Sequence, residues 1–216
     1  MSRIGLTQRV EVVEAYDERR DCLDQRWAPV VRSFDSIPIP LCNETEDVEA
    51  YVSALDLDGI VLTGGNDFAH LEDGVNTAPE RDAFERKLLR VAIDQKLPVL
   101  GVCRGLQLIN LVCGGSLARV DDHVAVDHPL DIELDSASIP DLPSRTSVNS
   151  YHTYGVTNET LGTDLVPVGR ASDGSIEWVE HERYPITGIM WHPERDGPLT
   201  ELDRRVICHR FESTNL

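Results

Sequence analysis

The segment that most constrains the fold is the run from Leu97 to Gln107, in which an apolar stretch leads directly into a cysteine between two glycines. Residues 97–102 are typical of a buried strand, and the residues after Cys103 predict an amphipathic helix. Gly101 and Gly105 allow the sharp turn that presents a side chain clear of a sheet, as in a nucleophile elbow. The start of a helix carries partial positive charge, so a thiolate is favoured at Cys103.

A second apolar strand, predicted at residues 186–191, leads into His192, and Glu194 follows two residues later. A cysteine nucleophile, a histidine base and a carboxylate that orients the base are then all placed after strand ends. We therefore predict that Cys103, His192 and Glu194 form a catalytic triad. The other cysteines have no such setting and are expected to be inert; they are Cys22, Cys42, Cys113 and Cys208.

The first half of the chain alternates between predicted strands and helices, which is typical of a mostly parallel sheet covered on both faces. The expected strands are 4–7, 37–41 and 58–63, and the expected helices are about 19–32, a helix capped by Asn43 that runs to about 54, and one that follows a capping box at 77–80.

The second half predicts an antiparallel extension, with short strands around 131–134, 146–149, 165–171 and 175–180 and a long irregular stretch across 116–146. The strand at 186–191 returns to the core, and a helix at about 199–211 closes the fold. A chain of 216 residues suits one α/β domain, so a single domain spanning 1–216 is expected.

The formal net charge of −18 argues against nucleic acid and anionic membranes as partners. With only two lysines, the composition fits either a concentrated-salt cytoplasm or an ordinary acidic enzyme, and both readings remain open. No segment reaches transmembrane length and no signal pattern opens the chain, so a cytoplasmic location is expected. Five cysteines without regular spacing argue against a disulfide framework.

A thiol that cleaves an amide also needs hydrogen-bond donors for the oxyanion. The backbone N–H of Arg104 follows the nucleophile, and Gly65, in the Gly64–Gly65 turn, is expected to offer a second N–H. The alternative for these glycines is a plain tight turn between a strand and a helix. The side chain of Arg104 could hold substrate or pack the elbow, and the sequence does not decide between them.

Four motifs together resemble the class I glutamine amidotransferase superfamily, and within it the γ-glutamyl hydrolase branch, peptidase C26. They are residues 101–107, Gly-Gly-Asn-Asp at 64–67, Ser-Tyr-His at 150–152 and Trp-His-Pro-Glu at 191–194. The resemblance implies a flavodoxin-like sheet, a γ-glutamyl thioester on Cys103 and water as the acceptor. We expect a small-molecule γ-glutamyl substrate and no cofactor. A homodimer is left open.

A narrower resemblance begins at the N-terminus, where residues 4–9, Tyr16, residues 18–23 and Trp27 resemble the γ-glutamyl-CDP-amidate hydrolases of capsular phosphoramidate synthesis. That resemblance implies release of glutamate and cytidine diphosphoramidate. The alternatives are a γ-glutamyl-γ-aminobutyrate-type hydrolase and a glutaminase subunit that passes ammonia to a synthase partner.

An anionic leaving group requires local cations in so acidic a chain, and Arg9, Arg19 and Arg20 are the candidates. For Arg19 and Arg20 a solvated helix face paired with neighbouring acids is an equal alternative.

The γ-glutamyl half must be recognised separately. Gln107 is expected to reach it, as the resemblance implies, and so are the residues of a strand and turn that the family places over it; these are Asn149, Ser150, Tyr151 and His152. We predict His192 as the base in preference to His152, because the sequence around His152 supplies no orienting acid.

A metal site is not expected. His123 and His128 flank Asp127 and follow Asp121 and Asp122, but their spacing is not that of a zinc site and favours an acidic loop.

Overall fold

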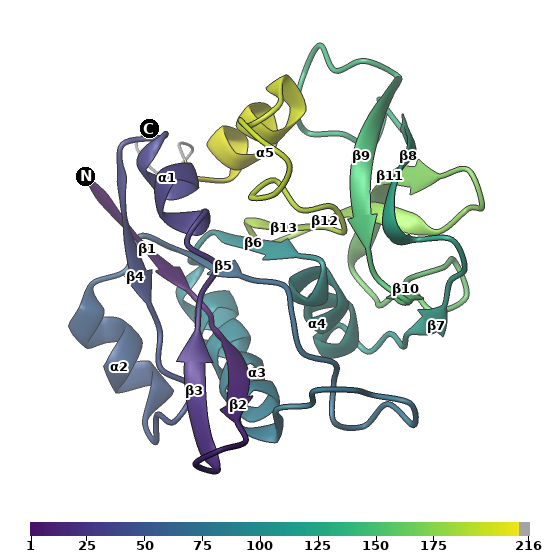
Figure 1. Cartoon of the computed structure of the whole chain (residues 1–216). Coiled ribbons are helices and arrows are strands. Elements are labelled where there is room, and N and C mark those ends of the chain that lie inside the picture. The colour runs from purple at the N-terminus through teal and green to yellow at the C-terminus, as the bar shows by residue number, and fades with distance from the viewer. Residues whose placement is uncertain (212–216) are drawn as a thin grey trace.

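The computed structural model describes residues 1–211, and within them nine strands form one continuous sheet (Figure 1). Across the sheet the order is β4 (Ser36–Pro40), β1 (Ser2–Leu6), β5 (Gly59–Leu62), β6 (Val99–Val102), β13 (Ile186–Ile189), β12 (Ile176–His181), β11 (Leu165–Ala171), β8 (Val124–Ile132) and β9 (Arg145–Tyr151). The strands from β4 to β13 are parallel, and those from β12 to β9 are antiparallel. The predicted α/β sheet with an antiparallel extension is thereby confirmed.

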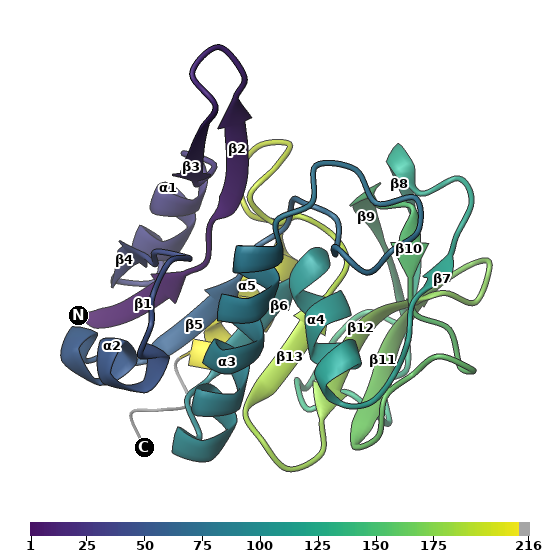
Figure 2. The ribbon, with the colours of Figure 1, turned by 90° about the horizontal axis from the view of Figure 1, so that it is seen from below.

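Helices cover both faces of the parallel half (Figures 1 and 2). α1 (Trp27–Arg32) and α5 (Glu201–Phe211) contribute to one apolar cluster, and α2 (Val48–Leu55), α3 (Pro79–Gln95) and α4 (Arg104–Val112) contribute to a second. β5 and β6 are buried at every position, as expected for parallel strands covered on two sides. No helix within residues 1–211 combines the length and apolar character needed to cross a membrane.

The predicted helix over 19–32 is wrong in its first half. β2 (Arg9–Val13) and β3 (Glu18–Cys22) instead form an antiparallel hairpin that projects from the sheet, and only α1 is helical (Figure 2). Two long-range hydrogen bonds hold β2 in place. The Asn66 side chain accepts from the N–H of Val10 at 2.8 Å and donates to the Val10 carbonyl at 3.0 Å. Local propensity in the charged β3 segment is overridden by this pairing.

Two predicted helix caps are also wrong. α2 is capped by Asp47, which accepts from the N–H of Ala50, whereas the Asn43 amide binds the Asp21 carboxylate at 2.7 Å. α3 begins at Pro79 without a side-chain cap, so the Thr77 capping box does not form. Proline suits the first helical position because the missing N–H has no helical partner there.

The stretch predicted to be irregular, 116–146, contains the nine-residue strand β8, which pairs with β9. It also contains β7 (Ala118–Arg119), which pairs with β10 (Tyr154–Gly155). A register shift lies between Val124 and Val126, with Ala125 at φ 56°, and both valines are exposed. A bulge of this kind interrupts the alternation of apolar and polar residues from which a strand is predicted.

Candidate active site

Cys103 lies in the sharp turn between β6 and α4, with φ 52° and ψ −104°. Such a backbone conformation in a residue with a side chain costs roughly 1–3 kcal/mol and is found mainly at functional sites. The turn requires the two flanking glycines. A Cβ on Gly105 would lie 2.2 Å from the carbonyl oxygen of Leu62, and one on Gly101 would lie 2.5 Å from Ile109 Cδ1. The predicted nucleophile elbow is therefore present.

His192 follows β13 and meets the elbow beside Gly64. A Cβ on Gly64 would lie 2.8 Å from His192 Cε1 and 3.7 Å from Cys103 Cβ, so this glycine leaves room for both side chains. Glu194 Oε1 lies 2.7 Å from His192 Nδ1, and both residues are buried. His192 Nε2 has no hydrogen-bond partner within residues 1–211, so it is available to the thiol. The structure brings all three predicted triad residues together.

The electrostatics favour a thiolate and an imidazolium. Burial by itself would lower the pKa of His192, but Cys103 and Glu194 outweigh it and raise this pKa to about 9. Burial by itself would raise the pKa of the Cys103 thiol, but His192 outweighs it and the pKa is lowered. An ion pair of this kind provides a strong nucleophile and a proton donor in the same site.

A buried ionic network joins the elbow to the Gly64–Gly65 turn. The Arg104 guanidinium pairs with Glu85 and Asp82 and stacks 4.2 Å from the Phe68 ring centre. Its side chain therefore packs the elbow and leaves only the backbone N–H for the predicted oxyanion role.

Arg81 completes this network. It pairs with Glu85 at 2.8 Å and donates to the carbonyls of Thr63, Gly64 and Gly65. Arg81 and Glu85 are fully buried, and neither was predicted as a site residue. The available signal was a pair of opposite charges four residues apart on the apolar face of a predicted helix.

Asn149 clamps the loop that carries His192. Its Oδ1 accepts from the His192 N–H at 2.7 Å, and its Nδ2 donates to the His192 carbonyl and to Asp196. The Tyr151 ring makes an edge contact with the His192 ring, at 5.6 Å between centres. Gln107 donates to the carbonyl of Tyr154 at 2.7 Å. These three predicted substrate-binding side chains therefore contact other residues of the protein around the site.

The remaining two residues of that predicted set point into the antiparallel half. The hydroxyl of Ser150, which is fully buried, donates to the His123 carbonyl at 2.8 Å. The sequence around His152 supplies no acid, as predicted, but the fold brings one to it, because Glu177 of β12 places a carboxylate oxygen 3.4 Å from His152 Nε2. The acid comes from a strand that the local sequence does not show. The interpretation of the segment around His123 and His128 as an acidic loop is wrong, because residues 124–132 form β8 and both histidines face Glu177.

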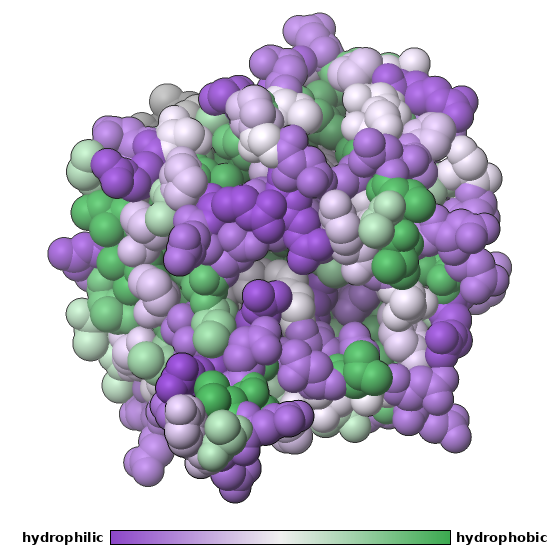
Figure 3. Space-filling view, viewed as in Figure 1, coloured by the Kyte–Doolittle hydropathy of each residue, from purple (hydrophilic) through white to green (hydrophobic). Residues whose placement is uncertain are grey.

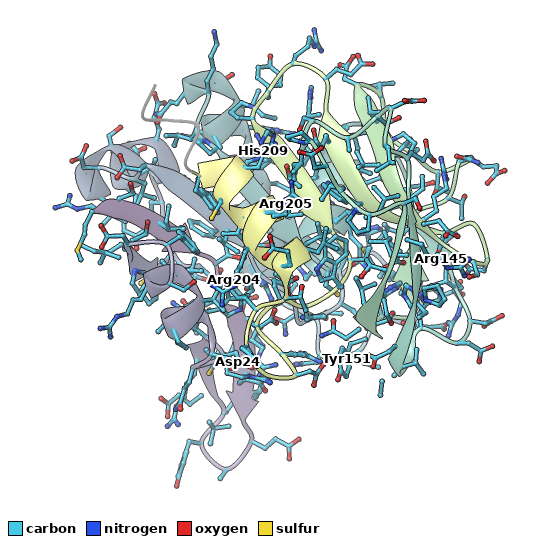
Figure 4. All side chains as sticks on the ribbon, turned by 90° about the horizontal axis from the view of Figure 1, so that it is seen from above. Asp24, Arg145, Tyr151, Arg204, Arg205 and His209 are labelled. Carbon is cyan, nitrogen blue, oxygen red and sulfur yellow. The ribbon has the colours of Figure 1, made fainter. Side chains whose placement is uncertain are left out.

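A cavity extends from the triad toward the N-terminal hairpin. Its lining includes His192, Glu194, Gly65 and two cationic side chains, Arg9 and Arg195. Figure 3 shows a hollow near the centre of this face, surrounded by hydrophilic residues. In Figure 4 Asp24, which also lines the cavity, and Tyr151 lie at the same edge of the molecule, on either side of the loop that follows β13.

The three predicted arginines differ in position. Arg9 pairs with Glu11 at 3.0 Å and packs its stem over Gly65 in this cavity, where a Cβ on Gly65 would lie 3.0 Å from Arg9 Cδ. Arg19 pairs with Glu80 at 2.5 Å and Arg20 with Glu18 at 2.9 Å, and neither lines the cavity beside the triad. Arg195 was not predicted. It stacks over the Tyr151 ring at 4.2 Å from the ring centre.

The peptidase C26 family model matches residues 3–194, which include the elbow, the turn after β5 and the His-Pro-Glu segment. The chain belongs to the peptidase C26 family. It is 30% identical over 202 residues to a γ-glutamyl-CDP-amidate hydrolase of Campylobacter jejuni, covering 92% of this chain and 93% of that protein. It is 31% identical over 211 residues to a γ-glutamyl-γ-aminobutyrate hydrolase of Escherichia coli, covering 84% and 82%.

Solved structures show the same fold. A putative GMP synthase subunit protein from Thermoplasma acidophilum superposes with a TM-score of 0.70 at 21% identity, over 98% of this chain and 93% of that one. A glutamine amidotransferase from Thermotoga maritima superposes with a TM-score of 0.64 at 16% identity, over 99% and 83%. The family and fold expected from the motifs are thus confirmed.

Proposed function

We propose that the protein hydrolyses a γ-glutamyl amide through a thioester on Cys103, and that γ-glutamyl-CDP-amidate is its substrate. The proposal rests on one observation above all, the buried contact of 2.7 Å between His192 and Glu194 beside a cysteine in a strained elbow. This arrangement supplies a nucleophile, a proton carrier and a group that fixes the tautomer of the carrier.

The proposed reaction has two halves. The Cys103 thiolate attacks the γ-carbonyl carbon, and the backbone N–H groups of Arg104 and Gly65 bind the oxyanion. The carbon–nitrogen bond then breaks as His192 gives its proton to the leaving nitrogen, which leaves a γ-glutamyl thioester. In the second half, His192 takes a proton from water, the hydroxide attacks the thioester, and the carbon–sulfur bond breaks to release glutamate and restore the Cys103 thiolate beside the protonated histidine.

The cavity toward the hairpin favours an anionic leaving group. Arg9 and Arg195 both line it, although the chain as a whole has a net charge of −18. Guanidinium groups bind phosphate oxygens through two parallel donors, so Arg9 and Arg195 suit the phosphate oxygens of such a leaving group. The similarity to the Campylobacter jejuni hydrolase over 92% of the chain agrees with that choice. We also propose a cytoplasmic location, where a nucleophilic thiol stays reduced.

A panel of three γ-glutamyl compounds tests the proposal. Release of glutamate is measured from γ-glutamyl-CDP-amidate, γ-glutamyl-γ-aminobutyrate and glutamine, with the Cys103→Ala variant as the blank. We expect the highest kcat/KM for the nucleotide compound and no turnover by the variant. A preference for γ-glutamyl-γ-aminobutyrate would replace the substrate with that of the Escherichia coli relative, and turnover by Cys103→Ala would refute the mechanism.

Arg9→Met then separates leaving-group recognition from the chemistry. Loss of one charge-assisted bond of about 1.5–3 kcal/mol corresponds to a fall in kcat/KM of roughly 10- to 150-fold for the nucleotide compound. Glutamine has no phosphate, so its slow hydrolysis should not change. Arg20→Met is the matched control, because Arg20 pairs with Glu18 outside the cavity and should affect neither substrate. An equal loss on both substrates would contradict a leaving-group role for Arg9.

A further inference from the structure

Three histidines surround a fully buried carboxylate in the antiparallel half of the sheet. Glu177 lies in β12 and has no exposed surface, while His123 precedes β8, His128 lies in β8 and His152 follows β9. The His123 ring centre is 4.7 Å from those of both other histidines. Within residues 1–211 no lysine or arginine forms an ion pair with Glu177, so the charge of this carboxylate is balanced only by what the imidazoles hold.

Each imidazole uses one nitrogen to donate outward from the cluster. His152 Nδ1 lies 3.1 Å from the carbonyl oxygen of Tyr154, and His128 Nδ1 lies 3.0 Å from that of Pro129. His123 Nε2 lies 3.1 Å from a carboxylate oxygen of Asp173, and the Ser175 hydroxyl lies 3.4 Å from the same nitrogen. Carbonyl and carboxylate oxygens only accept, so these three nitrogens carry hydrogen. In a neutral ring the other nitrogen then has a free lone pair.

The free nitrogens all point at Glu177. His123 Nδ1 and His152 Nε2 lie 3.6 and 3.4 Å from its Oε1, and His128 Nε2 lies 3.7 Å from its Oε2. These separations exceed good hydrogen-bond lengths. They approach the roughly 3.3 Å between neighbouring ligand atoms of a tetrahedral zinc site with bonds of about 2.0–2.1 Å.

Two further contacts complete the surroundings of these atoms. The Ser150 hydroxyl lies 3.2 Å from His123 Nδ1 but gives its own hydrogen to the His123 carbonyl, and Ser175 Oγ lies 3.5 Å from Glu177 Oε1. Three inward atoms, on His128, His152 and Glu177, have no hydrogen-bond partner in the described part of the chain. Lone pairs that converge in a buried site are stabilised either by a proton on one of the imidazoles or by a metal cation between them, and separations of 3.4–3.7 Å leave room for the cation.

We propose that His123, His152 and Glu177 form a binding site for a divalent transition metal of the zinc class. Each residue offers one ligand atom, and these atoms lie within 4.8 Å of one another. The outward bonds to Asp173 and to the Tyr154 carbonyl are those that orient metal-bound histidines in proteins. Three protein ligands leave a coordination position for water.

Zinc binding is measured in the full chain carrying Cys103→Ala. This substitution removes a thiol that would otherwise compete for zinc together with His192. The chelator-treated protein is titrated with ZnCl2 in a calorimeter, and CoCl2 is used as a spectroscopic probe. We expect one metal per chain, a higher melting temperature with zinc, and visible absorption bands from Co²⁺ with nitrogen and oxygen ligands. These readouts do not depend on turnover, so they fail or succeed independently of the proposed hydrolysis.

Three variants in the same background locate the site. His123→Asn removes a ligand and should weaken zinc binding by more than about 100-fold, while Asp173→Asn removes only the orienting carboxylate and should weaken it by about 10–100-fold. Asp173 has a side chain 45% exposed, so that variant is expected to fold. His70→Asn, at an exposed histidine outside the cluster, is the control and should bind as before. Absence of zinc binding by the Cys103→Ala protein, or equal binding by all three variants, would overturn the proposed site. Protons on the imidazoles would then be the only cations that balance the charge of Glu177.

Discussion

The contact between Glu194 and His192 sets the alkaline limit of activity, and Glu194→Gln tests how strongly. The carboxylate accepts from His192 Nδ1 at 2.7 Å, and both side chains are at least 95% buried. A hydrogen bond to a charged group in such a setting stabilises by about 1.5–3 kcal/mol. One pKa unit equals about 1.36 kcal/mol, so this bond accounts for about one to two units of the imidazolium's stability.

The sign of the expected change follows from the raised pKa of His192. The proton stays on His192 up to about pH 9, so kcat/KM in the wild type should fall above that pH as His192 loses it. The amide side chain of the Glu194→Gln variant would still accept the hydrogen bond but would carry no charge. Deprotonation should therefore begin about one to two pH units lower, near pH 7–8. Burial, which lowers the pKa of His192, is then opposed mainly by Cys103.

The assay is glutamate release at substrate concentrations far below KM, measured across pH 5–10 for the wild type and the variant. The matched control is Glu182→Gln, which removes one exposed carboxylate and should leave the profile unchanged. An alkaline limit that stays at about pH 9 in Glu194→Gln would refute the view that Glu194 holds the proton on His192. Loss of rate without a shift would assign Glu194 to orientation alone.

Three other perturbations follow from the packing and charges of the site. Arg195→Met should lower kcat/KM for γ-glutamyl-CDP-amidate by roughly 10- to 150-fold and leave glutamine hydrolysis unchanged, because the lost bond is to the leaving group. An equal loss on both substrates would contradict a leaving-group role for Arg195. Gly105→Ala places a Cβ 2.2 Å from the Leu62 carbonyl oxygen, so thermal unfolding should reveal severe destabilisation, and a wild-type melting temperature would exclude the clash. Arg81→Met breaks a fully buried pair with Glu85 and should cost about 3–5 kcal/mol in denaturant unfolding, whereas a loss below about 1 kcal/mol would show that the pair is replaceable.

The parallel half of the fold was predictable because its strands are buried on both faces and carry a local signature. The runs that became β5, β6 and β13 are short segments buried at every position, and the Gly64–Gly65 turn, Cys103 and His192 follow them within three residues. The carboxyl ends of parallel strands meet at one edge of a sheet, so the triad could be expected to assemble there.

The hairpin β2–β3 and the strand β8 were not predictable in this way, because distant contacts decide their conformation. The charged segment 18–22 has no strand pattern of its own and is extended only because it pairs with β2, which the Asn66 side chain holds. In β8 the register shifts at Ala125, which has a positive φ. Val124 and Val126 are exposed although they are apolar, so the sequence does not show which face of the strand is buried.

The side chains that the sequence assigned to substrate show a related limit. Residue type and position after a strand predict that a polar group lies near the site, but they do not predict which way it points. The side-chain amide of Asn149 forms hydrogen bonds with the main chain of His192, and that of Gln107 forms one with the main chain of Tyr154. Arg195 lines the cavity, but the sequence did not predict it as a site residue. It directly follows the triad acid Glu194 and belongs to no motif that would indicate a separate role.

The two halves of the predicted oxyanion site lie about 40 positions apart in the sequence, yet one helix links them physically. Arg81 of α3 donates to the carbonyls of the Gly64–Gly65 turn, and Glu85, one helical turn later, binds both Arg81 and Arg104 of the elbow. A buried carboxylate between two guanidinium groups stays ionised, since their charges outweigh the burial that would otherwise raise its pKa. Because an unpaired charge at this depth would be costly, the turn and the elbow cannot separate without breaking the network. The spacing between the two backbone N–H groups is therefore set by α3, and catalysis should be sensitive to substitutions on that helix even though no α3 side chain is proposed to contact the substrate.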